Sequence, residues 1–193
     1  MSLELETAPI LEPLTITDLR DHLRIDTDSE LEAEELKAYI SAARRWCEMM
    51  QKRAYITQTW NWALDSWPTS PVNVPKPPLQ SVSSIMYYDT DETGAEFSSD
   101  YYQQDVISQP GRISLVYGQT WPSTTLRPMN GIVIQFIAGY GTAETAVPDN
   151  IVQAIRLLAG HWYENRENSE IKKLEDIPFG VEALLWQERV GII

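Results

Sequence analysis

The sequence predicts an α+β fold in which a helical core carries an inserted antiparallel β subdomain. Residues 30–51 and 148–167 repeat apolar side chains every three or four positions, as helices that face a core do. Between them, residues 55–140 are rich in aromatic and β-branched side chains and are interrupted by turn residues. This order of helices, strands and helices indicates a β region inserted into a helical framework.

The chain divides into three parts on this basis. Residues 1–54 are expected to form an N-terminal arm and helices, residues 55–145 a β-rich insertion, and residues 146–193 the C-terminal helices that complete the helical core. A short terminal helix is predicted at residues 181–190. A chain of 193 residues is long enough to bury a sizeable core.

The segment 148–167 has the features of a complete helix. Pro148 suits the first helical turn, where a missing N–H costs nothing, and Asp149 places a carboxylate at the positive end of the helix dipole. Four apolar residues then recur at intervals of three or four: Ile151, Ile155, Leu158 and Trp162. We expect this face to pack into a core.

The segment 30–51 is the predicted packing partner of that helix. Ser29 and Glu32 match a capping box, in which the serine oxygen and the acidic side chain satisfy free backbone donors. Its apolar stripe supplies four further core candidates: Leu36, Ile40, Ala43 and Cys47. The two stripes are expected to face each other.

A shorter helix is predicted ahead of it, after an extended arm over residues 1–14. Thr15 and Asp18 form a second capping-box pattern, and the helix should continue to about Leu23.

Strands are predicted in the β region wherever aromatic or β-branched runs lie between turn signals. The predicted strands span residues 55–64, 72–74, 81–88, 101–106, 112–115 and 132–137. The last of these is almost wholly apolar, so we expect it to be central and buried on both faces. Ala138-Gly139-Tyr140-Gly141 ends it.

Composition and charge exclude several classes of function. A formal net charge of −13 opposes a phosphate backbone, so direct nucleic-acid binding is disfavoured. No apolar run approaches the roughly 18 residues of a membrane span, and the acidic N-terminus lacks the cationic start of a secretion signal. A single cysteine, Cys47, rules out an intramolecular disulfide and is expected to be a small buried residue.

Motifs that carry chemistry are missing. His161 and Glu164 could supply two metal ligands from one helix, but no third ligand accompanies them. There is no Gly-x-Ser-x-Gly elbow, and Gly139-Tyr140-Gly141 lacks the further residues of a dinucleotide or phosphate loop. We therefore predict no catalytic, cofactor-binding or metal-binding residues and no enzymatic activity.

The order of landmarks along the chain resembles the head-to-tail connector (adaptor, or head-completion) proteins of tailed bacteriophages and gene-transfer particles. The matching segments are Leu14–Asp26, the long helix ending near Arg53, Ile56–Trp60, Pro77–Val82, Ala138–Gly141, Val147-Pro148, His161–Glu167 and Ile177–Leu185. Each is weak alone, but together they span nearly the whole chain in a fixed order.

The resemblance implies a structural role in the virion. Proteins of this family form a ring, usually of twelve subunits, beneath the portal, and the ring is the attachment surface for neck, stopper or tail-completion proteins. The implied partners are the portal protein, the next neck or tail component and further copies of the chain, while DNA passes the channel without specific binding. The implied location is the head–tail interface of the virion, and the bacterial host cytoplasm during assembly. No cofactor is implied.

The C-terminal end is predicted to dock onto the portal. It concentrates apolar residues behind a charged stretch, and an unpartnered monomer has little reason to expose such a patch. The candidate docking residues are Phe179, Leu184, Leu185, Trp186, Val190, Ile192 and Ile193. The alternative is that the same residues close the subunit's own core.

Two other classes of function compete with the connector. A small-ligand or carbohydrate-binding module would use the aromatic β region as its site and would show a concave pocket lined by Trp and Tyr. A cryptic hydrolase would use His161 with Glu164 or Glu167. The connector instead requires apolar flanks that are covered by neighbouring subunits.

Overall fold

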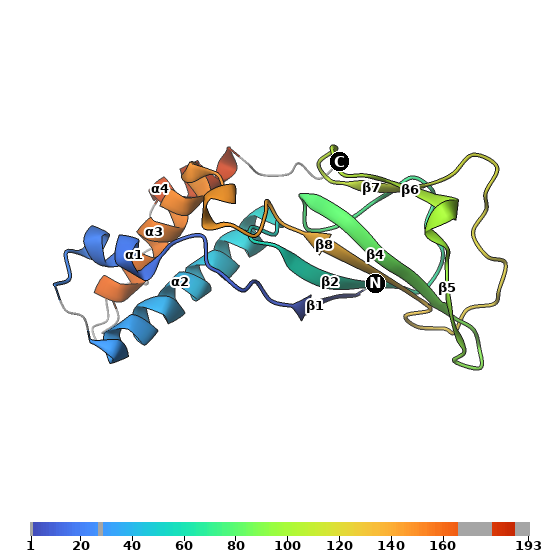
Figure 1. The fold of residues 1–193 in the computed structure, drawn as a ribbon, viewed down its shortest axis with the longest axis horizontal. Coiled ribbons are helices and arrows are strands. Elements are labelled where there is room, and N and C mark those ends of the chain that lie inside the picture. The colour runs from blue at the N-terminus through green and yellow to red at the C-terminus, as the bar shows by residue number, and fades with distance from the viewer. Residues whose placement is uncertain (1, 27–28, 166–178, 188–193) are drawn as a thin grey trace. The chain divides into compact units, whose positions relative to one another are not determined.

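The structure is a computed structural model and describes residues 2–26, 29–165 and 179–187. The fold is mixed α+β, as predicted: within the described residues there are four α-helices and two antiparallel sheets (Figure 1). The chain forms two compact units. One comprises Met1–Pro9 and Thr57–Tyr140, and the other comprises Ile10–Ile56 and Gly141–Ile193. We call them the β unit and the helical unit.

The helical unit is built on two helices that run side by side. The helices described in it are α1 (Ile16–Leu23), α2 (Glu30–Gln51), α3 (Asp149–Glu164) and α4 (Phe179–Trp186), with a short 3-10 turn at Glu144–Ala146. Helix α3 packs on all three others, and its longest contact is with α2. The long helix matches its predicted bounds, α3 is shorter at its C-terminal end, and α4 begins two residues earlier than predicted.

The two capping predictions have different outcomes. Thr15 caps α1 as expected: its hydroxyl oxygen accepts a hydrogen bond from the backbone N–H of Asp18 at 3.0 Å. Ser29 is the N-cap residue of α2, but its side chain makes no capping hydrogen bond. The capping box predicted for Ser29 and Glu32 is therefore not formed, and α2 is held by packing of its apolar face.

The core of the helical unit lies between the facing stripes of α2 and α3. Seven of the eight predicted core residues are at most 1% exposed: Leu36, Ile40, Ala43, Cys47, Ile151, Ile155 and Leu158. The eighth, Trp162, is only half-buried. It lies one turn from the end of α3, where the helix emerges from the core.

The β unit contains a five-stranded sheet with the order β1-β2-β8-β4-β5 and a three-stranded sheet with the order β3-β7-β6. The strands are β1 (Ser2–Thr7), β2 (Gln58–Leu64), β3 (Val72–Asn73), β4 (Leu79–Tyr88), β5 (Gly94–Glu96), β6 (Tyr102–Asp105), β7 (Arg112–Leu115) and β8 (Ile132–Ala138). A 3-10 turn at Ser99–Tyr101 precedes β6. All pairings between these strands are antiparallel.

Strand β8 is central, as predicted, but the prediction that both its faces are buried was wrong. It pairs with β2 on one side and β4 on the other, and burial alternates strictly along it. Ile134 is 1% exposed and lies in register with Trp62 and Ile85, which are also buried. Val133 and the other alternate residues are half-buried because they lie on the opposite face of the sheet.

Two strands were not expected. Strand β1 lies in the segment predicted to be an extended arm, and it pairs with β2 along the edge of the larger sheet. Glu4 and Glu6 lie on this edge, and the register shifts between Leu5 and Thr7. Charged side chains and a bulge are the usual means by which an edge strand is protected from pairing with other chains. The three-residue strand β5 lies between the predicted strands 81–88 and 101–106.

Candidate functional site

The predicted docking residues fall on two sides of α4. Leu185 is 4% exposed and, with Val181, packs onto the helical core, whereas Trp186 is 64% exposed. Leu184 is half-buried. Val190, Ile192, Ile193 and the side chain of Phe179 lie outside the described residues. Within the described part, α4 therefore closes its own core with one face and presents a single large aromatic ring to solvent.

The end of α4 is capped by side chains from two other helices. The amide nitrogen of Gln51, in the last turn of α2, donates to the carbonyl oxygen of Leu185 at 2.6 Å. The amide nitrogen of Asn150, in the first turn of α3, donates to the carbonyl oxygen of Leu184 at 3.3 Å. The last turn of a helix leaves carbonyls without an intrahelical partner, and no basic residue of α4 lies there. Both caps come from distant parts of the chain.

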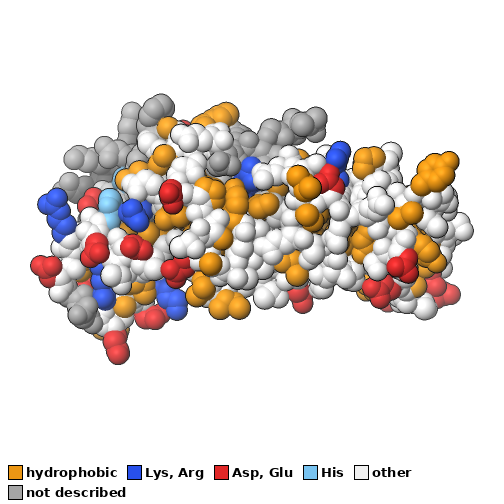
Figure 2. All heavy atoms as spheres, turned by 45° about the horizontal axis from the view of Figure 1, so that its top comes forward, with side chains coloured by type: hydrophobic (Ala, Val, Ile, Leu, Met, Phe, Trp, Pro, Cys, Tyr) orange, Lys and Arg blue, Asp and Glu red, His pale blue; other side chains and the backbone are white. Residues whose placement is uncertain are grey.

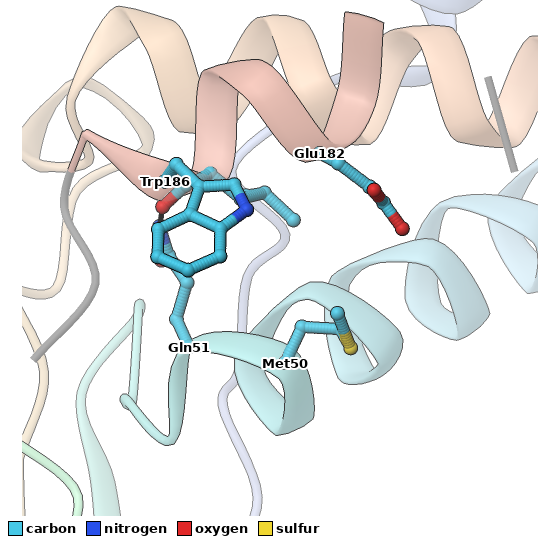
Figure 3. Close-up of a pocket in the computed structure, with 5 residues that line it drawn as sticks. Met50, Gln51, Glu182 and Trp186 are labelled. Carbon is cyan, nitrogen blue, oxygen red and sulfur yellow. Dashed lines mark hydrogen bonds between the residues drawn. The ribbon is translucent and has the colours of Figure 1, made fainter. Parts of the chain in front are cut away.

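A small open pocket lies beside this helix end. It is lined by Met50, Gln51, Glu182, Leu185 and Trp186, and its empty volume is about 250 Å³, including space open to solvent (Figure 3). Such a volume is below that of most small-ligand sites. Met50, which is 39% exposed, adds apolar surface from α2 to the pocket beside Trp186. The surface suits a protein partner better than an enclosed ligand.

Gln51 belongs to a buried polar network. Its side-chain oxygen accepts a hydrogen bond from the Tyr55 hydroxyl at 2.7 Å, and the Tyr55 backbone N–H donates to the Glu48 carboxylate at 2.9 Å. Glu48 in turn accepts from the Arg44 guanidinium at 2.7 Å, and Arg44 also donates to Glu12 at 2.6 Å. The network joins the segment before α1 to α2 and to the end of α4.

One guanidinium holds two carboxylates in this network. Burial alone would lower the pKa of Arg44, but the hydrogen bond to Glu12 and the charges of Glu48 and Glu12 outweigh it, so that the pKa is raised. Arg44 therefore stays cationic and holds both carboxylates. Removing one partner of such a buried ion pair destabilises the fold more than replacing both partners by apolar residues, because it leaves an uncompensated buried charge.

The predicted role of Cys47 is consistent with its environment. Cys47 is free and fully buried. Burial, with a smaller contribution from the charge of Glu48, raises the pKa of the thiol to about 12. A thiol that stays protonated is a poor nucleophile and a poor metal ligand.

His161, the histidine candidate, lies beside Asn165 at the end of α3. The Nδ1 atom of His161 lies 3.2 Å from the side-chain nitrogen of Asn165 on the same helix. Among the described residues, no group of three or more His, Cys, Asp or Glu side chains is placed to hold a metal ion. Glu167 lies outside the described residues.

The aromatic residues of the β unit pack against one another. Trp67 stacks on Trp121 with ring centroids 4.7 Å apart, and Phe97 contacts both rings. The Trp121 indole N–H donates to the carbonyl oxygen of Pro68 at 2.9 Å. A further pocket of the β unit is lined by Pro71, Gln103, Gln104, Asp105, Arg112 and Ser114, none of which is aromatic. These rings form a packed cluster and do not line that pocket.

The surface of both units is acidic. The β unit contains three Lys or Arg against nine Asp or Glu, and the helical unit contains twelve against nineteen, giving formal charges of −6 and −7. Figure 2 shows acidic side chains gathered near the right-hand end of the drawn face, with no cationic side chain among them. Within the described residues, no helix is long and apolar enough to span a membrane.

Comparison with protein families decides which family the chain belongs to. The model of the phage gp6-like head-tail connector proteins matches residues 13–110, about half of the chain. The chain belongs to this family. The matched range runs from the segment before α1 through β6 and omits β8, α3 and α4. The family is one of structural connectors, and the resemblance noted in the sequence is confirmed.

Solved structures extend the similarity to the whole chain. A chain in the virion of a native gene transfer agent (GTA) particle is 26% identical, with a TM-score of 0.81. Chains in the neck of an empty GTA particle with C6 symmetry and in the neck of a native GTA particle with C12 symmetry are 26% and 27% identical, with TM-scores of 0.82 and 0.75. Each match covers 100% of this chain and 97% of the other. A comparison with curated proteins found no match.

Sequence reasoning missed the two residues that cap α4. Gln51 and Asn150 are separated from the carbonyls they cap by 134 and 34 residues, so no local pattern connects them. The sequence carries only a weak sign of this role: Gln51 is a polar residue in the last turn of α2, where the apolar stripe of the helix ends. Only the packing of α2, α3 and α4 gives these amides their role.

Proposed function

We propose that the protein is a structural connector subunit of the virion neck, located at the head–tail interface. The observation that carries this proposal is the match over the full length of the chain to a neck component of GTA particles, at 26% identity and a TM-score of 0.82. Membership of the head-tail connector family supports the same role independently. The protein acts by assembly and not by catalysis.

The subunits assemble into a ring beneath the portal. Support comes from the C6 and C12 symmetry of the neck structures that contain the similar chains. In a ring, one face of each subunit meets a different face of its neighbour, and closure sets the number of subunits. We propose twelve subunits, with one rim attached to the portal protein and the other available to a stopper or tail-completion protein.

The exposed end of α4 is the proposed portal contact. Trp186 is exposed beside Met50, and exposed apolar patches on an otherwise polar subunit mark contact sites. Tryptophan is enriched among the few residues that dominate binding energy in protein interfaces. Leu184 and the terminal residues after Trp186 extend this contact in our proposal, whereas Leu185 faces the subunit's own core.

The net negative charge of the subunit is compatible with a channel through which DNA passes. Both units carry a net negative formal charge, so a ring of identical subunits would be strongly anionic. Phosphate-binding proteins depend on Lys and Arg contacts that release counterions. We propose that DNA passes the ring without specific binding.

Mass measurement of the protein with purified portal tests the assembly. We expect a monomer or a mixture of small species at low micromolar concentration without portal, and a closed ring in one-to-one subunit ratio on the portal. Native mass spectrometry and electron microscopy of the mixture read out both states. A compact dimer that ignores the portal would contradict the proposal.

A further inference from the structure

The end of α4 is capped by side chains from outside the helix. Two carbonyls of its last turn, those of Leu184 and Leu185, receive hydrogen bonds from the side chains of Asn150 and Gln51. Gln51 is 2% exposed, so its amide is withdrawn from water and depends on protein partners. The amide serves α4 and not its own helix.

Only one orientation of the Gln51 amide satisfies both its partners. The nitrogen donates to the Leu185 carbonyl, and the oxygen accepts from the Tyr55 hydroxyl. If the amide were turned over, two oxygen atoms without a hydrogen between them would face each other at the Leu185 carbonyl. The Tyr55 backbone is itself held by the carboxylate of Glu48. The Gln51 amide is therefore held from two sides, by the Tyr55 hydroxyl and by the Leu185 carbonyl.

The position of Gln51 has a consequence for the exposed surface. Trp186 directly follows Leu185, so the hydrogen bond on the Leu185 carbonyl restrains the peptide that carries the indole. Figure 3 shows Gln51 rising from the end of α2 toward α4 and ending beneath the Trp186 ring, with Met50 on the same side. A solvent-exposed ring gains affinity as an anchor when it is held in its bound position beforehand.

We propose that Gln51 is a positioning residue for partner binding: by capping α4 from α2, it holds Trp186 in the orientation in which the portal receives it. Asn150 supports the same turn from α3. This inference rests on the proposed portal contact of Trp186, but its structural part stands on the contacts of Gln51 alone. Gln51 itself touches no partner in this scheme.

The test compares Gln51→Met with Tyr163→Phe in the full-length protein. Methionine has nearly the shape of glutamine but cannot cap the Leu185 carbonyl. Tyr163→Phe removes a hydrogen bond of 2.8 Å to Glu32, between α3 and α2 in the same unit, at the opposite end of α3 from Asn150. Hydrogen exchange of the α4 backbone and ¹⁹F NMR of fluorotryptophan-labelled protein, with the Trp186 signal assigned from Trp186→Phe, read out the effect.

In Gln51→Met we expect exchange of the α4 amides to become about tenfold faster, as loss of one buried hydrogen bond implies. The Trp186 signal should shift or broaden, and Tyr163→Phe should leave both unchanged. Equal behaviour of the two variants would overturn the proposal. If Gln51→Met does not fold, Tyr55→Phe releases the same amide more gently, and unaltered α4 exchange in that variant would also overturn it.

Portal binding separates this inference from the proposed function. Gln51→Met should weaken binding to purified portal about fivefold in the wild-type background and have no effect in a Trp186→Ala background, because Gln51 acts through Trp186. Equal weakening in both backgrounds would reject a positioning role. If Trp186→Ala alone leaves portal binding unchanged, the docking proposal fails, while the exchange and NMR results still decide whether Gln51 orders the end of α4.

Discussion

Single residues show where the fold tolerates no change. The facing stripes of α2 and α3 bury aliphatic side chains completely, and the buried charged groups Arg44 and Glu48 are joined in one hydrogen-bonded network. A charge elsewhere in this interior would have no partner. The β unit has a comparable point at Gly111, where two segments approach so closely that no side chain fits.

Ile155→Asp places a charge in the centre of the helical core. Ile155 is fully buried on α3, in the apolar stripe that faces α2. We expect the free energy of unfolding to fall by several kcal/mol, roughly 3–5, as for other unpaired buried charges. Urea denaturation followed by circular dichroism measures the change. Ala42→Asp, on the exposed side of α2, is the control and should cost less than about 1 kcal/mol. An unaltered midpoint for Ile155→Asp would refute the packing.

Gly111→Ala introduces a single methyl group into a contact that has no room for it. A Cβ atom at Gly111 would lie 2.4 Å from the Cβ of Leu79 and 3.1 Å from the carbonyl oxygen of Asp105. We expect a loss of about 1–3 kcal/mol, as for other overpacked sites. The loss should shrink in a Leu79→Gly background, because that change removes the Cβ atom of Leu79 that the new methyl group meets. Additive thermal-unfolding shifts in the double variant would count against this explanation.

The buried residues of the helical unit could be predicted because helical periodicity is a property of the sequence itself. Ile40 and Ile155 are examples, since each lies on a stripe that only a helix would align. Trp162 continues the same stripe but is half-buried, because periodicity does not tell where a helix leaves the core. Gln51 could not be predicted, since its partner is the carbonyl of a residue on another helix.

Elements were predicted where composition and pattern agree. Helix α2 and strand β8 have long, consistent patterns, whereas β1 and β5 do not. Strand β1 alternates Leu with Glu but exposes nearly all its residues, and pairing with β2 across more than fifty residues decides its conformation. Strand β5 has three residues, including a glycine, and exists because β4 offers it an edge.

Deletion of residues 186–193 tests the terminal element as a contact site. The deletion keeps Val181 and Leu185, whose burial against the core holds α4. We therefore expect a normal circular dichroism spectrum and melting curve. Because an aromatic anchor can contribute more than about 2 kcal/mol to binding, the affinity for portal should fall more than about tenfold. A portal pull-down and a titration by biolayer interferometry measure this.

Both possible failures of the deletion are informative. Loss of folding would show that the terminal segment closes the subunit's own core, which is the alternative that the sequence leaves open. Normal folding with undiminished portal binding would remove the docking role of Trp186 and of the residues that follow it.

The whole molecule combines two acidic units in one subunit, and the proposed ring brings many such subunits together. The formal charge of −13 is divided almost evenly between the β unit and the helical unit. Neither unit therefore has an excess of Lys and Arg over Asp and Glu. Neighbouring subunits in a ring must therefore overcome mutual repulsion. The portal can offset this cost by holding the subunits at a common site.

Ring formation without portal should consequently depend on salt. The Debye length falls from about 10 Å at 0.1 M to about 3 Å at 1 M, so added sodium chloride screens repulsion between subunits while apolar contacts remain. We expect the protein concentration at which rings appear to fall at least about threefold between 0.1 M and 0.5 M sodium chloride. Sedimentation velocity over a concentration series measures it. Rings that dissolve as salt is added would show instead that attraction between opposite charges holds the subunits together, and the contacts between neighbours would then have to pair the few cations of one subunit with carboxylates of the next.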